Sequence, residues 1–187
     1  TQDYRNCSIE NYNEAIDHII SLGGTVFRIG INGGHTLKAR PYLYDVRSPN
    51  YKRLQLCLSA KCKFLLGCSS GAAFMATFFG KPVALANLIP VTTMPYTACD
   101  LGLHKHIVDI KSGRKLSILE ALESSVADAF VSSMYGNHYK YLENDNKEIL
   151  RLVSAMLDQI HGRSIDAFSI EYNPTDYAYK TMAKIIL

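Results

Sequence analysis

The sequence predicts an α/β fold in which helices cover both faces of a parallel sheet. Short runs rich in β-branched and aromatic residues alternate with helical segments, and the links between them are short. This alternation is typical of consecutive βαβ units. The composition agrees, because 187 residues with 48% hydrophobic and 20% charged side chains can form one core without disulfide or metal support. We therefore expect a Rossmann-like domain.

The first half of the chain supplies most of these units. A helix is predicted over residues 9 to 22, because apolar residues recur there at helical spacing, Ser8 can cap its start and Gly23-Gly24 can end it. Strands are expected over 25–30, 42–46, 63–68 and 83–88. Two further helices are expected between them. One follows Pro49 and carries Tyr51, Leu54, Leu56, Cys57 and Leu58, and the other covers 70–79 and ends before Gly80 and Pro82.

The second half is mostly helical. A helix capped by Asp145 or Asn146 is predicted to run to Ile160, and the break at Gly162 ends it. We expect one domain over residues 1–162 and a tail over 163–187 whose last part, 176–187, is helical. The other elements expected are short helices over 117–124 and 128–134, a marginal strand over 139–142, and either a strand or an extended loop over 104–110.

Charge is distributed unevenly. Residues 1–93 hold ten Lys and Arg against five Asp and Glu, whereas residues 94–187 hold ten against twelve. The basic excess is scattered and forms no run, so it favours a small anion such as a nucleotide or sugar phosphate, and no nucleic-acid partner is expected.

The cysteines and the first residue indicate the cellular compartment and whether the chain is part of a longer protein. The five cysteines are odd in number and lie mainly in apolar runs, which favours reduced, buried thiols and a cytoplasmic protein. No stretch approaches the ~20 apolar residues of a membrane helix. The chain begins at Thr1 instead of Met, so we expect it to be part of a longer protein.

The run Gly67-Cys68-Ser69-Ser70-Gly71 is the most informative motif, and it has three interpretations. Between a strand and a helix, its small residues suit an anion site at the helix N-terminus. It also matches G-x-S-x-G, the nucleophile elbow of serine hydrolases, with Ser69 as nucleophile. It can equally be a simple serine-capped turn. The hydrolase would use Gly33-Gly34 as oxyanion donors, Asp100 or Asp128 as acid, and His138 or His161 as base.

Ordered blocks of residues lie along about four-fifths of the chain. They are Arg5-Asn6, Asn11-Tyr12, Ala15-Ile16, Gly23-Gly24 with Val26 and Arg28-Ile29-Gly30, Cys57 to Phe64, Gly67 with Ser69-Ser70-Gly71, and Phe79 to Leu85 with Asn87 and Pro90. In this order and spacing, the blocks resemble a family of bacterial surface-polysaccharide glycosyltransferases with a GT-B-type architecture. Two departures from that family are Cys68, where a hydroxyl residue is expected, and the loop Ile31-Asn32-Gly33-Gly34-His35, which lacks acidic, proline-rich text.

The resemblance implies the C-terminal, nucleotide-sugar-binding half of such an enzyme. Ser69, Ser70 and Gly71 would then contact the donor phosphates, with Arg28 and Gly30 at the end of an earlier strand. A salt bridge between Arg28 and Asp45 is the alternative role for that arginine. Asn87 would reach the base or ribose, and Arg5 and Asn6 would face the donor.

The implied activity is transfer of a sugar from a nucleotide-sugar to a glycan or lipid-linked glycan acceptor, without a metal or other cofactor, because no D-x-D triplet occurs. His35 is the one weak candidate for the catalytic base, and the missing N-terminal domain of the same protein would bind the acceptor. Such an acceptor would bring a cytoplasmic enzyme to the inner membrane. A serine esterase, a sugar-nucleotide epimerase and a non-catalytic nucleotide-sugar-binding module remain the alternative functions.

Overall fold

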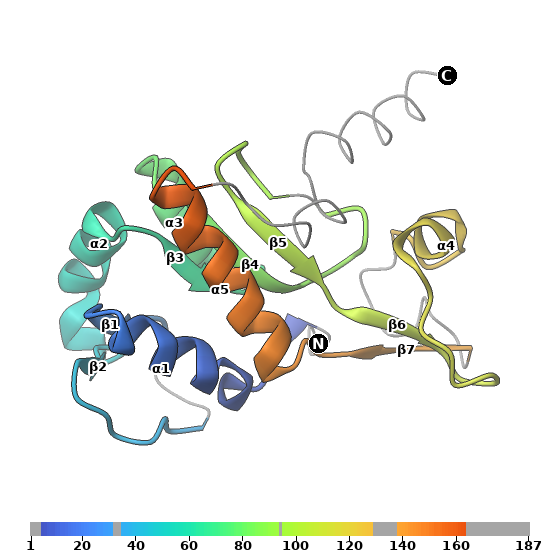
Figure 1. The fold of residues 1–187 in the computed structure, drawn as a ribbon, viewed down its shortest axis with the longest axis horizontal. Helices are drawn as coiled ribbons and strands as arrows, with labels where there is room; N and C mark the ends of the chain where they lie inside the picture. The colour runs from blue at the N-terminus through green and yellow to red at the C-terminus, as the bar shows by residue number, and fades with distance from the viewer. Residues whose placement is uncertain (1–4, 32–34, 94, 129–137, 164–187) are drawn as a thin grey trace.

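A computed structural model describes residues 5–31, 35–93, 95–128 and 138–163. Within these residues, seven strands form three small sheets (Figure 1). The chain is therefore mixed α/β with parallel strands, as predicted. The parallel pair is β1 (Val26–Arg28) with β2 (Leu43–Asp45), the parallel three-stranded sheet is β3 (Leu65–Gly67), β4 (Val83–Leu88) and β5 (Leu101–His104), and the antiparallel pair is β6 (His106–Asp109) with β7 (Tyr139–Leu142).

The helices begin where the sequence supplies caps. Ser8 accepts a hydrogen bond from the Glu10 N–H, and Asp145 forms a reciprocal capping box with Glu148, as expected for side chains that satisfy free backbone donors. The helical elements are η2 (Ile9–Tyr12), α1 (Asn13–Ser21), η3 (Pro49–Tyr51), α2 (Lys52–Lys61), α3 (Gly71–Phe78), α4 (Ile118–Glu123) and α5 (Asn146–Ile160).

Strand β4 is the centre of the fold and is buried on both faces. Val83 and Leu85 pack into one core cluster with Ala73 and Ala76 of α3. Ala84 and Ala86 point the other way, into a cluster formed largely by η2, α1 and α5. Figure 1 shows α5 and α3 on opposite faces of this sheet. Alternation along a fully apolar strand therefore places helices on both faces, as predicted.

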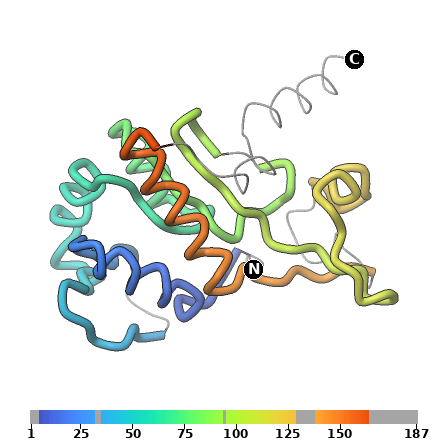
Figure 2. The backbone as a smooth tube through the Cα atoms, in the orientation of Figure 1, coloured from blue at the N-terminus to red at the C-terminus, as the bar shows by residue number. Residues whose placement is uncertain are grey.

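The strands do not form one continuous sheet within the described residues. The predicted extended segment 104–110 divides at Lys105, whose N–H donates to the Leu88 carbonyl at the end of β4. From His106 onward the chain leaves the parallel sheet and pairs antiparallel with β7. This pair and α4 form a separate arm at one end of the molecule (Figure 2). The sequence left this segment open as a strand or an extended loop, and it did not predict the change of partner at Lys105.

Helix α2 departs from the predicted pattern. Its buried residues are Gln55 and Ser59, while Leu54, Leu56 and Cys57 are exposed. Gln55 accepts from the Gly30 N–H and donates to the Val46 carbonyl, so its amide is satisfied where it is buried. The expectation of buried thiols is therefore wrong for Cys57, and also for Cys99, which is exposed, although all five cysteines are free.

Several sequence expectations lie outside the described residues. These are the helix over 128–134 beyond Asp128, and the tail beyond Arg163 with its predicted final helix. The break after α5 is present, since Gly162 adopts a positive φ of 67°. Among the described helices, none is long and apolar enough to cross a bilayer.

Two asparagines fasten the second half of the chain to the central sheet. The Asn87 N–H donates to Asn144 Oδ1 at 2.7 Å, and the Asn144 N–H returns a bond to Asn87 Oδ1 at 2.8 Å. Asn144 Nδ2 also donates to the His104 carbonyl at 2.9 Å. The amide pair thus connects β4, the end of β5 and the turn before α5.

Replacing Asn144 by alanine should destabilise the fold strongly. The change removes the acceptor of the buried Asn87 N–H and a donor to the His104 carbonyl, which costs about 2–4 kcal/mol of unfolding free energy. Urea unfolding of Asn144→Ala measures it, with Asn50→Ala, at an exposed asparagine, as the control. Equal unfolding midpoints for the two variants would contradict the assigned role.

Candidate functional site

The carboxyl ends of β3, β4 and β5 meet at one edge of the parallel sheet. Ligands of open α/β folds bind at this edge, because loops diverge there and helix N-termini point toward it. Cys68 and Ser69 follow β3, Asn87 lies near the end of β4, and Lys105 follows β5. The edge therefore gathers residues from three separate parts of the sequence.

Helix α3 starts at this edge without a side-chain cap. Ser70 is its N-cap residue, with extended backbone, but the Ser70 hydroxyl makes no capping bond. Ser69 is 7% exposed, and its buried Oγ has no hydrogen-bond partner among the described residues. A Cβ atom added at Gly71 would meet no neighbouring atom within 4 Å beyond its own stretch of chain. The helix start therefore combines uncapped backbone, a buried unsatisfied hydroxyl and open space.

Two cations from distant segments reach the same edge. Arg5 Nη2 donates to the Ser69 carbonyl at 2.8 Å, across 64 residues of sequence. Lys105, which is buried, donates from Nζ to the Asn6 carbonyl at 2.7 Å. Arg5 therefore lies beside the predicted phosphate loop, whereas exposed Asn6 takes part through its main chain.

Glu143 holds this N-terminal segment in place. Its Oε2 accepts hydrogen bonds from the Ser8 N–H at 2.8 Å and from Asn11 Nδ2 at 3.0 Å, and its Oε1 lies 4.0 Å from Lys105 Nζ. Sequence reasoning placed neither Lys105 nor Glu143 in a site. Glu143 directly follows the predicted strand over 139–142, and Lys105 lies inside the predicted extended segment 104–110, so neither position indicated a site.

The N-terminal segment also carries the Cys7 thiol, whose Sγ lies 3.5 Å from the Tyr12 hydroxyl. The effects of Cys68 and then Tyr12, with the nearby Lys105 charge, lower the pKa of Cys7 to about 6 against the effects of burial and Glu143. Cys7 and then burial raise the pKa of Cys68, and burial raises that of Tyr12.

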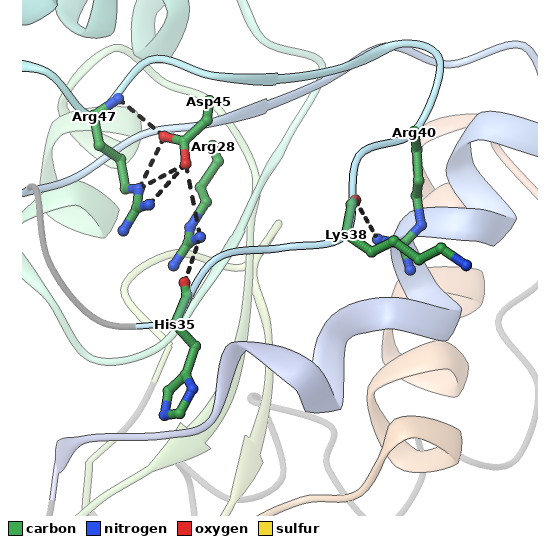
Figure 3. Close-up of polar contacts among 6 residues, drawn as sticks. All are labelled: Arg28, His35, Lys38, Arg40, Asp45 and Arg47. Atoms are coloured by element: carbon green, nitrogen blue, oxygen red, sulfur yellow. Dashed lines mark hydrogen bonds and ion pairs between the residues drawn. The ribbon is translucent and has the colours of Figure 1, made fainter.

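Arg28 lies in a second cluster, at the carboxyl ends of β1 and β2 (Figure 3). Its Nη1 is 3.7 Å from Asp45 Oδ2, which confirms the predicted salt bridge, and donates to the His35 carbonyl at 2.8 Å. Arg47 binds the same carboxylate at 2.7 Å. The hydrogen bonds from Arg47 lower the pKa of Asp45, whereas burial and then the Arg47 charge lower that of Arg28.

The other predicted site residues are distributed as follows. The His35 imidazole is exposed and points away from the Arg28 and Asp45 pair (Figure 3). Gly30, with φ of 124°, donates its N–H to Gln55 at 3.0 Å. Asn87 is fully buried, adopts φ of 57° at a register shift between Leu85 and Leu88, and contacts Asn144. Ser69, Ser70, Gly71 and Arg5 are thus brought together, and Arg28, Gly30 and His35 form the second cluster.

Three of the four acids and bases of the hydrolase interpretation, Asp100, Asp128 and His161, are engaged elsewhere. Asp100 accepts from the Val83 N–H at 2.7 Å and from the Thr97 N–H at 2.8 Å, which places it at the amino edge of β4, opposite Ser69. Asp128 accepts from the Thr92 hydroxyl, and His161 contacts Arg163. Gly33-Gly34 lies outside the described residues.

The two histidines on either side of Lys105 bind different partners. His104 Nε2 lies 2.7 Å from the Thr93 carbonyl, and His106 Nε2 lies 2.7 Å from Glu148 Oε1. Across the described part of the chain, no three His, Cys, Asp or Glu side chains are grouped as metal ligands.

Comparisons with protein-family models, with curated proteins and with solved structures found no match to this chain. Its function is therefore inferred from its own residues and their contacts.

Stability should fall as the pH is lowered through the weakly acidic range, because of His104. Burial lowers its pKa from 6.5 to about 4, so the folded protein keeps the imidazole neutral while the unfolded chain binds a proton. The stabilisation of the folded state by neutral His104 is therefore complete above pH 6.5. It is lost as the pH falls from 6.5 to about 4, and the unfolding free energy decreases by roughly 3 kcal/mol in total.

Urea unfolding across this pH range measures the effect. His104→Gln retains a donor for the Thr93 carbonyl but cannot titrate, so its stability should depend less on pH than that of the wild type. His35→Gln, at an exposed histidine, is the matched control. An unchanged pH slope in His104→Gln would refute the assignment.

Proposed function

We propose that the chain is the donor-binding half of a metal-independent glycosyltransferase of GT-B type with a Rossmann-like fold. It would bind a nucleotide-sugar and supply the sugar to a glycan or lipid-linked glycan acceptor. The start of α3 carries the proposal: an N-terminus with no side-chain cap, beside the buried Ser69 hydroxyl that lacks a partner among the described residues. A phosphate oxygen would supply acceptors for both.

The charges near this helix start fit a diphosphate. Free backbone N–H groups and the helix dipole favour an anion there, and small residues allow it to approach the backbone. Arg5 and Lys105 place positive charge at the same edge of the sheet. In sugar transfer, negative charge develops on the leaving diphosphate, so these groups would stabilise the transition state electrostatically.

The second cluster supports a role for the other end of the donor. Ile29 packs against the core cluster that β3, β4 and α3 form together, so the end of β1 lies beside that part of the core. Arg28 and Gly30 flank this contact point. We assign Arg28 to the sugar or outer phosphate, and we assign the acceptor site and the catalytic base to the N-terminal half of a longer enzyme.

The geometry favours transfer over serine hydrolysis. A nucleophilic serine needs a base within hydrogen-bonding distance. The described residues give the Ser69 hydroxyl no such partner, and Asp100 is engaged at the opposite edge of the sheet. An anion-binding role requires only a donor hydroxyl, which Ser69 provides.

Adding a negative charge at the helix start should separate binding from folding. Gly71→Asp places a carboxylate where phosphate would bind, so nucleotide affinity should fall by roughly tenfold or more, or ~1–2 kcal/mol. The same carboxylate lies in the first turn of α3, and a Cβ at residue 71 has open space around it, so folding stability should stay equal or rise slightly.

Ligand-observed NMR with UDP, GDP, CMP, ADP, dTDP and their sugar conjugates measures binding. Gly71→Asn, of nearly the same size but neutral, is the control and should retain affinity. Equal binding by both variants, or loss that merely follows unfolding, would contradict the proposed phosphate site. No binding across the panel, together with fluorophosphonate labelling that Ser69→Ala abolishes, would instead indicate the hydrolase.

A further inference from the structure

The C-terminal end of α3 exposes a cluster of aromatic side chains. Phe78, the last residue of the helix, is 86% exposed, and Phe74, one turn earlier on the same face, is also exposed. Phe79 follows directly, and its ring meets that of Phe78 edge to face, with the ring centroids 5.7 Å apart. A single exposed apolar residue is ordinary, but three neighbouring phenylalanines indicate a surface that binds a partner.

Three lysines surround this aromatic end of α3. Lys61 is the last residue of α2, which packs beside α3 (Figure 1). Lys63 and Lys81 lie two residues before β3 and β4, and these strands pair in parallel with their first residues in register, so the two lysines enter the sheet side by side. The Lys81 N–H donates to the Ala76 carbonyl at 3.0 Å, which holds Lys81 against the end of α3.

Acidic residues are missing from the sequence around these lysines. Residues 46–99 hold six Lys and Arg and no Asp or Glu. Within the part of the chain that the structure describes, none of the three lysines forms an ion pair. Asp100, which also lies at this edge of the sheet, is fully buried and accepts two backbone N–H groups. The face is therefore both apolar and positively charged, and it complements an anionic partner that can take up aromatic rings.

We propose that the aromatic end of α3 docks the protein on an anionic lipid bilayer. Phe78 and Phe79 would enter the boundary between headgroups and acyl chains, and the three surrounding lysines would contact the lipid phosphates. Apolar insertion and electrostatic attraction act together in such attachment, and the two give firmer binding than either gives alone.

The composition of the face favours a bilayer over other anionic or apolar partners. Its cations are all lysine, whose flexible ammonium group makes point contacts and lacks the planar fork with which arginine binds guanine bases in nucleic acids. A second copy of the chain is disfavoured as the partner, because a two-fold contact would place the lysines of one copy against those of the other.

Docking at this end would leave the opposite end of α3 open. The helix spans eight residues, so its two ends lie about 12 Å apart, and the candidate phosphate site is at the other end. Nucleotide binding and membrane attachment would therefore use opposite ends of one helix. The inference does not rest on the proposed sugar transfer, and substitutions at Phe78 should leave nucleotide binding unchanged.

Co-sedimentation of the full chain with lipid vesicles tests the proposal. Vesicles of equal parts phosphatidylglycerol and phosphatidylcholine should bind the protein, those of phosphatidylcholine alone should not, and high salt should weaken the binding. Phe78→Ser should reduce vesicle affinity by on the order of tenfold. Leu119→Ser, at a 63% exposed leucine of α4, is the matched control and should retain it. Equal melting temperatures show that both variants fold.

The lysines are tested with a control of equal net charge. Replacing the three lysines of this face together by glutamine should lower the affinity for phosphatidylglycerol vesicles by roughly a hundredfold. The control replaces three exposed lysines outside this face by glutamine, namely Lys111, Lys115 and Lys147. It removes the same charge from the chain and should have a much smaller effect.

Insertion can be measured directly, because the sequence contains no tryptophan. The emission of Phe78→Trp should shift to shorter wavelength on phosphatidylglycerol vesicles, whereas that of Leu119→Trp should not. Equal vesicle binding by Phe78→Ser and the wild type, or equal loss in the two triple lysine variants, would overturn the proposal. So would dimerisation that Phe78→Ser abolishes, or oligonucleotide binding without vesicle binding, because either result assigns the face to a different partner.

Discussion

The reciprocal amide pair between Asn87 and Asn144 is the interaction on which the candidate site depends. Asn87 occupies a left-handed conformation at a register shift in β4, a geometry that asparagine tolerates better than most residues. The distorted strand turns backbone groups away from the sheet, and Asn144 satisfies them. The site edge is therefore built where regular strand pairing ends.

Residues next to this pair and its partner His104 in the chain make the other contacts of the site. Asn144 binds the His104 carbonyl, so the next residue, Lys105, is fixed at the edge. Glu143 precedes Asn144 and holds the N-terminal segment through the Ser8 N–H. Polar contacts thus run from the centre of the sheet to the segment that carries Arg5 and Cys7. Because these groups are buried, each loses more by being unpaired than an exposed group would.

Local elements were predictable from sequence, and contacts across the chain were not. The capping box at Asp145 and the apolar alternation of β4 are local signals, and both are present in the structure. Gln55 is buried on α2 because distant backbone groups bind its amide, which no periodicity reveals. The contact between Arg5 and Ser69 spans 64 residues, and that between Asn6 and Lys105 spans 99.

The same limit applied to the candidate site. The run from Gly67 to Gly71 was recognisable because a strand, small residues and a helix follow one another directly. The unpartnered state of the Ser69 hydroxyl became visible only with its surroundings. Reduced, buried thiols were expected from the apolar runs around most of the cysteines, whereas Cys7, Cys62 and Cys68 are only half-buried, because burial depends on packing that the local sequence does not show.

The loop before α3 is restrained by the N-terminal segment at Ser69. The carbonyl of Ser69 accepts from Arg5 Nη2 at 2.8 Å, so the loop and the N-terminal segment hold each other. The Ser69 hydroxyl, which has no hydrogen-bond partner among the described residues, and the uncapped start of α3 belong to the same turn. Any ligand at the helix start therefore binds close to Arg5, and the N-terminal segment is part of the site although it belongs to neither the strand nor the helix that defines it.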